Sequence, residues 1–194
     1  MIKIIDRYTE KLIANKIIIP EDKELYTYGF HQGMIIIANI ATTILVGFIF
    51  GMVWQSIVFM LAYISLRSYA GGFHAKTQVR CNVYSVLLIS AVLLLVKFIP
   101  WTSYAAIGLL LFSYLIIFIL APVEDSNKPL DKEEAKVYKR RTRLILGIET
   151  LIILLLMVFA LHQIIVVISV SMFALACMLV IGKVKQDLYS HKAF

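Results

Sequence analysis

The sequence predicts an all-α fold: a polytopic membrane bundle of about six transmembrane helices, preceded by an amphipathic interfacial helix. The chain of 194 residues is 61% hydrophobic and only 16% charged. Its mean hydropathy of +0.87 lies far outside the range of soluble domains. Apolar runs recur near the length of about 17 to 25 residues that a helix needs to cross a bilayer. Backbone groups inside lipid must be satisfied internally, so the spans are expected to be helices.

The N-terminal segment, residues 1–32, is expected to contain the amphipathic helix. Between residues 2 and 17 the apolar side chains fall near one face and the charged ones elsewhere, a pattern typical of a helix that lies in the membrane interface. Pro20 either ends this helix or begins a second short one. The segment could anchor the bundle or contact a substrate, and both roles stay open.

Six apolar segments follow, and each is expected to form one span: residues 33–54, 57–73, 82–99, 102–121, 144–161 and 163–181. The second is the weakest, because only residues 57–66 are apolar throughout. No linker divides the chain, so residues 1–194 are expected to form a single integral membrane domain.

The positions of lysine and arginine orient the spans. They gather in the two tails, in residues 67–81 and in residues 122–143, whereas the intervening turns hold almost none. Basic loops stay in the cytoplasm, so both termini and residues 67–81 are expected at the cytoplasmic face of the cell membrane. The net charge of +7 is therefore attributed to topology and not to nucleic-acid binding.

Residues 67–81 form a polar, glycine-broken segment that carries the candidate chemistry. His74 and Cys81 lie seven residues apart beside basic side chains. Cysteine reacts as a thiolate, which a nearby base and positive surroundings favour, so the pair reads as a nucleophile and its base. On one straight helix the two would be about 10.5 Å apart along the axis, so a working dyad requires a bend. Alternatively, they are an interfacial histidine and an unrelated cysteine.

A family resemblance favours the dyad. The pattern Arg67-x3-Gly71-Gly72-x-His74-x6-Cys81 resembles the signature of the accessory gene regulator B (AgrB) family of membrane cysteine endopeptidases. The stretch from Ala121 to Leu130, followed by a run of basic residues, is also similar. The resemblance covers essentially the whole chain.

The resemblance implies a quorum-sensing peptidase that acts on an AgrD-type propeptide. Cys81 would be the nucleophile and His74 its general base, with cleavage coupled to closure of a thiolactone or lactone ring. Backbone amides near Cys81, and Gln78, are candidate oxyanion donors. The resemblance also suggests a homodimer, and no cofactor is expected.

Two further groups of charged residues are candidate supports for this site. Arg67 and Glu149 are expected at a similar depth, where ionisable groups are usually paired or functional. An Arg67–Glu149 ion pair, orientation of His74 by Glu149, and a water-facing acid all remain open. The basic run at Lys139, Arg140 and Arg141 could bind the acidic tail of the propeptide or anionic membrane lipids, or could only fix topology.

A metal site and a transporter or scaffold fit the sequence less well than a peptidase. His31, His162 and His191 have no cysteine or acidic partner at ligand spacing, so no metal site is assigned. A small transporter or membrane scaffold is the alternative to a peptidase. A transporter should carry broken helices and polar residues near the bilayer centre, whereas here the chemistry gathers at one edge.

Overall fold

The computed structural model describes residues 2–73, 77–124 and 131–190. Over these residues the chain is helical and contains no strand, which confirms the all-α class and fits a membrane bundle. The helices are α1 (Ile2–Ala14), α2 (Lys23–Phe50), α3 (Val53–Ala70), α4 (Gln78–Phe98), α5 (Ser103–Leu120), α6 (Lys132–Val158) and α7 (His162–Ser190), with a 3-10 turn at Pro20–Asp22. The chain divides into two compact units, Met1–Thr42 and Thr43–Phe194.

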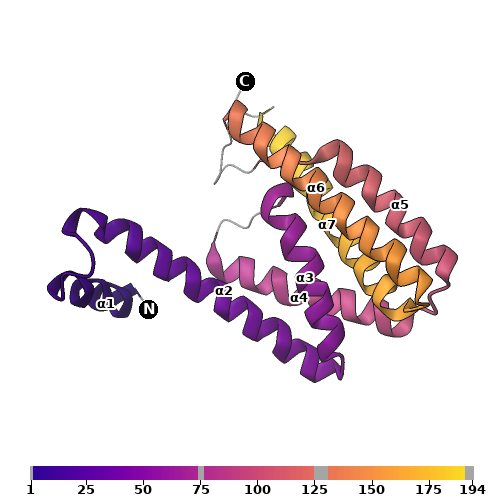
Figure 1. Cartoon of the computed structure of the whole chain (residues 1–194), viewed down its shortest axis with the longest axis horizontal. Helices are drawn as coiled ribbons and strands as arrows, with labels where there is room; N and C mark the ends of the chain where they lie inside the picture. The colour runs from indigo at the N-terminus through magenta and orange to yellow at the C-terminus, as the bar shows by residue number, and fades with distance from the viewer. Residues whose placement is uncertain (1, 74–76, 125–130, 191–194) are drawn as a thin grey trace. The chain divides into compact units, whose positions relative to one another are not determined.

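In the first unit, α1 packs beside the beginning of α2 (Figure 1). The Thr27 hydroxyl donates to the Thr9 hydroxyl oxygen at 3.2 Å, and Lys23 forms an ion pair with Glu10 at 3.2 Å. Pro20 begins the turn that leads into α2, since α1 has already ended at Ala14. The predicted amphipathic helix is present, but α2 runs without a break past residue 32, where that segment was expected to end. Its place in the membrane interface stays a prediction.

Each of the six predicted spans is mostly helical, but α2 ends at Phe50, α3 covers Val53–Ala70 in place of residues 57–73, and α6 ends at Val158. Four helices, α2, α4, α5 and α7, are long and apolar enough to cross a membrane. The two others carry more polar residues: α3 contains Arg67 within its last turns, and α6 begins with a highly charged half.

Helix α7 is the centre of the second unit. It packs against α3, α4, α5 and α6. Of its most apolar stretch, 67% is buried inside the protein. Figure 1 shows α5, α6 and α7 running side by side. Because four helices pack against α7, a substitution on it can alter the packing of several helices at once.

Side-chain caps explain where two of the helices begin. The Thr77 hydroxyl accepts a hydrogen bond from the Arg80 amide at 3.4 Å at the start of α4. At the start of α6, Asp131 and Glu134 form a reciprocal capping box. Within the expected basic loop of residues 122–143, the chain is therefore helical from Lys132 onward, because the capping box starts a continuous helix there.

Candidate active site

The chain breaks its helix between the two candidate catalytic positions. Helix α3 ends at Ala70 and α4 begins at Gln78, after Thr77 in an extended conformation. The helix is thus interrupted at residues 71–73 and at Thr77, which supplies the bend that a working dyad requires. His74 itself lies outside the described residues, so its distance from Cys81 stays a prediction.

The two glycines after α3 permit a close backbone contact. Gly71 and Gly72 have φ values of 72° and 110°, which side-chain-bearing residues rarely adopt. The Gly72 amide donates to the Val123 carbonyl at 3.1 Å, and the Val123 amide donates to the Ala70 carbonyl at 2.9 Å. A Cβ on Gly71 would collide with the Val123 carbonyl oxygen. These glycines therefore seat the segment on the chain that leaves α5.

The same segment also docks on α7. The Phe73 amide donates to the Met178 carbonyl at 3.1 Å. Gly182 gives the room for this contact, since a Cβ there would lie 2.7 Å from the Phe73 nitrogen and 2.8 Å from the Gly72 carbonyl carbon. Sequence reasoning missed Gly182, although a lone glycine inside a long helix is a known sign of close backbone approach.

Arg67 makes a third set of contacts with residues 71–73, in addition to those from Val123 and Met178. Its guanidinium donates one hydrogen bond to the Gly71 carbonyl and another to the Phe73 carbonyl. A planar guanidinium with several donors is suited to bridge two acceptors in this way. Arg67 is thus a positioning residue for the backbone that leads into residue 74.

The Phe73 ring joins this segment to the helix that carries Cys81. It packs edge-on against Tyr84 of α4 with centroids 5.6 Å apart, and the Lys185 ammonium of α7 lies 5.0 Å from its centroid. Tyr84 lies three residues after Cys81, and residues three apart share a helix face. The residue before His74 is therefore held against the turn that carries Cys81.

Cys81 is a half-buried free thiol in the first turn of α4. Its amide donates to the Thr77 carbonyl at 3.0 Å, and its carbonyl accepts from the Ser85 hydroxyl at 3.0 Å.

The predicted Arg67–Glu149 ion pair is not formed. Glu149 is buried, with 7% exposure, and accepts a hydrogen bond from the Ser65 hydroxyl at 2.7 Å. Its other carboxyl oxygen is buried and has no hydrogen-bond partner among the described residues. Equal depth does not fix direction: Ser65 and Arg67 are two residues apart, about 200° around a helix. Burial also rules out the water-facing acid, while a contact with His74 stays outside the described residues.

The basic residues of α6 divide into two groups. Arg141 lies over the Tyr69 ring at 5.2 Å and donates to its hydroxyl at 3.4 Å, which links α6 to α3. Lys139 and Arg140 are exposed, as is Arg141 itself. The structure therefore gives Arg141 a packing role that the sequence did not predict.

Within the described ranges, no group of three or more His, Cys, Asp and Glu side chains could hold a metal ion.

Comparison with protein families decides the affiliation. The family described as Accessory gene regulator B matches residues 5–181. The chain belongs to the AgrB family. AgrB is a membrane family with a role in the accessory gene regulator system, so the resemblance noted in the sequence is confirmed.

Relatives that carry the name AgrB-like are similar at modest identity. One from Clostridium perfringens strain SM101 is 27% identical over 60% of this chain and 58% of its own length. Another from Clostridium perfringens strain 13 is 26% identical over 65% and 64%, and one from Listeria monocytogenes EGD-e is 29% identical over 68% and 69%. The chain thus spans about three fifths of the two Clostridium perfringens proteins. No solved structure matches it significantly.

Proposed function

We propose that this AgrB family member is a membrane-embedded cysteine endopeptidase that removes the C-terminal tail of an AgrD-type propeptide. Cys81 is the nucleophile and His74 its general base, at the cytoplasmic face. The reaction also promotes closure of the thiolactone or lactone ring of the autoinducing peptide. A second copy of the chain is the proposed partner in a homodimer.

The proposed reaction has two acyl-transfer steps. The Cys81 thiol transfers its proton to His74 and attacks the scissile carbonyl, so a C–S bond forms while the C–N bond breaks. The amine of the departing tail takes the proton from the imidazole. A cysteine or serine side chain of the bound peptide then gives its proton to His74 and attacks the thioester. The new C–S or C–O bond closes the ring while the bond to Cys81 breaks, which returns the Cys81 thiolate. Backbone amides at the start of α4, where Gln78 is the first residue, are the candidate oxyanion donors.

One observation carries this proposal: the contact between Phe73 and Tyr84. It joins the backbone next to His74 to the helix turn of Cys81. Arg67, Val123 and Met178 fix the same backbone by hydrogen bonds. Nucleophilic catalysis needs the base within reach of the nucleophile, and this packing favours such an approach.

The exposed cations of α6 are the proposed contact for the propeptide tail. Lys139 and Arg140 have no acidic partner within the described part of the chain. The family's propeptides carry an acidic tail, which these cations would attract. Neutralising both should raise the propeptide KM and leave kcat nearly unchanged, whereas a purely topological role would leave both constants intact.

Co-expression with the AgrD-type propeptide tests the reaction. The native chain is expected to cut the propeptide, and Cys81→Ala and His74→Ala to lose cleavage by about a thousandfold or more. Cys177→Ala is the matched control for loss of a thiol and should cut normally, because it keeps the α7 backbone, through which the neighbouring Met178 contacts Phe73. An uncut propeptide with the native chain would refute the proposal and favour a transporter or scaffold.

A second experiment traps the intermediate. A propeptide whose ring-forming side chain is replaced by alanine cannot close the ring, so the acyl group should remain on Cys81. Mass spectrometry should then find the chain with the peptide attached, and neutral hydroxylamine should remove it, as expected for a thioester. An adduct that survives hydroxylamine, or that also forms on Cys81→Ala, would contradict the assignment.

A further inference from the structure

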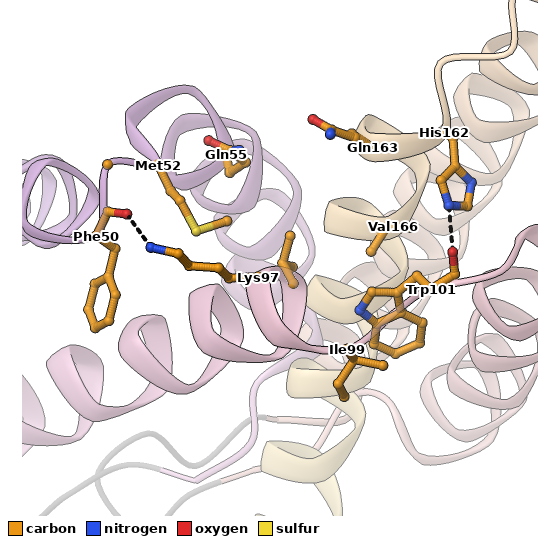
Figure 2. A pocket seen from close by; sticks show the side chains of 11 residues that line it. Phe50, Met52, Gln55, Lys97, Ile99, Trp101, His162, Gln163 and Val166 are labelled. Atoms are coloured by element: carbon orange, nitrogen blue, oxygen red, sulfur yellow. Dashed lines mark hydrogen bonds between the residues drawn. The ribbon is translucent and has the colours of Figure 1, made fainter.

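A polar cavity lies at the end of α4 opposite Cys81. Lys97 follows Cys81 by 16 residues on that helix, a distance of about 24 Å along the axis. Beside it opens a cavity of about 380 Å³, between the α2–α3 turn, the end of α4 and the start of α7. All of its lining residues belong to the unit Thr43–Phe194. Figure 2 shows the Lys97 side chain at one side of this space, directed toward the Phe50 carbonyl.

Lys97 brings an uncompensated positive charge to the cavity. Its ammonium donates one hydrogen bond to the Phe50 carbonyl at 3.2 Å, drawn in Figure 2. An ammonium has three donors, so further donors remain for a ligand. Lys97 has no acidic partner in the described part of the chain. The cavity therefore favours an anionic group.

Two amides complete the polar lining. Gln55 and Gln163 both line the cavity, and the side-chain oxygen of Gln55 is buried without a hydrogen-bond partner among the described residues. His162 is already occupied, since its Nε2 bonds to the Trp101 carbonyl at 2.9 Å and its Nδ1 faces the Ser103 hydroxyl at 3.4 Å. The groups left for a ligand are thus one cation and two amides that can pair with hydroxyl groups.

The residues around the cavity indicate that its ligand comes from the membrane. Trp101 lines the cavity, and indoles prefer the membrane–water boundary. Helix α4, with 21 residues, is long and apolar enough to cross a bilayer. Basic pockets between membrane helices are suited to anionic lipid headgroups. A phosphate with adjacent hydroxyl groups satisfies both the charge and the amides.

We propose that this cavity binds a glycerol phosphate group, the headgroup of an anionic phospholipid. The Lys97 ammonium contacts the phosphate, and the amides of Gln55 and Gln163 contact the glycerol hydroxyls. The site is at the membrane face opposite Cys81 and is independent of the proposed peptidase activity.

Lipid binding by the purified full-length chain tests this proposal. In a neutral detergent, native mass spectrometry should find phosphatidylglycerol retained in preference to phosphatidylcholine, whose headgroup lacks hydroxyls. Lys97→Gln should weaken this retention about tenfold, and Lys97→Arg should preserve it. Lys132→Gln, at an exposed lysine of α6, is the matched control and should bind like the native chain.

Two further arms separate the alternatives. Soluble glycerol 3-phosphate that displaces the lipid at equal concentration would support the phosphate site and assign it to a soluble ester. Equal losses in Lys97→Gln and Lys132→Gln would overturn the proposal, because they would show general charge attraction. If Lys97→Gln fails to fold, Gln163→Leu replaces it: the side chain is exposed, and loss of the preference for phosphatidylglycerol is expected. An unchanged preference in that variant would also overturn the proposal.

Discussion

Gly72 shows how a single residue can set the geometry of the candidate site. Its φ of 110° is unfavourable for any residue with a side chain, at a cost of about 1 to 3 kcal/mol. A Cβ would also press on the Arg67 guanidinium and lie 3.1 Å from the Met178 carbonyl oxygen. The conformation and the close packing therefore demand glycine for separate reasons.

Gly72→Ala is accordingly expected to abolish propeptide cleavage while the chain still inserts in the membrane. The cleavage rate in membrane vesicles measures this effect. Gly108→Ala is the matched control, since a Cβ there meets nothing within 4 Å. Normal cleavage by Gly72→Ala would contradict the proposed role of the segment.

The hydrogen bond between Ser65 and Glu149 leads to a prediction about stability. Ser65→Ala removes the donor and leaves both carboxyl oxygens of buried Glu149 without a partner among the described residues. The free energy of unfolding should therefore fall by about 1 to 3 kcal/mol. Glu149→Gln keeps an oxygen that accepts from Ser65 and should be tolerated. Thermal unfolding in detergent compares the two variants. A severe loss of stability in Glu149→Gln would instead indicate that the charge itself is needed.

At the scale of elements, α7 supports the candidate site through its backbone. The Met178 carbonyl accepts a hydrogen bond from the Phe73 amide. Gly182 lets the glycine segment, residues 71–73, approach the α7 backbone closely. A side chain at position 182 would meet backbone atoms, which cannot turn aside as a flexible side chain can. The segment would have to move away from α7.

Gly182→Ala should therefore slow cleavage by about a hundredfold, because catalysis is sensitive to displacements of about 1 Å. The propeptide KM should change little, since the variant moves the proposed base and not the cations of α6. Gly147→Ala on α6 is the control, because nothing lies within 4 Å of its added Cβ. Equal kinetics in the two variants would contradict the role of α7.

The sequence predicted the bounds of the helices better than the direction in which their side chains point. Residues 102–121 were expected as a span, and α5 covers Ser103–Leu120, since apolar runs between polar turns mark helix length. The capping residues Asp131 and Glu134 were readable in the sequence, but the charge of the following run suggested a loop. The Arg67–Glu149 pair was wrong because depth along a helix says nothing of rotation about it.

At the scale of the whole molecule, hydropathy identified a membrane bundle but not its centre. The later spans are all strongly apolar, and an apolar helix can face lipid or protein equally well. The central place of α7 depends on contacts between distant parts of the chain, which periodicity does not encode. For the same reason, neither the segment that packs on Gly182 nor the cavity beside Lys97 could be located from the sequence.

The proposed orientation of the bundle can be tested with single cysteines. In a chain with Cys81→Ser and Cys177→Ala, a cysteine at position 104, where the tyrosine is 88% exposed, should react with a membrane-impermeant thiol reagent outside intact cells. A cysteine at position 132 should react only after permeabilisation, because basic segments stay inside. The reverse pattern would invert the topology and move the candidate site to the outer face.

We expect helix α7 to make the protein sensitive to bilayer thickness. Val166 lines the cavity and Gly182 receives the glycine segment, and they lie 16 residues apart on one unbroken helix, about 24 Å. A helix adapts to a thinner or thicker hydrocarbon layer by changing its tilt. A tilt of α7 would displace its Gly182 end relative to Phe73, so the acyl-chain length of the host membrane would set how well the candidate site is assembled.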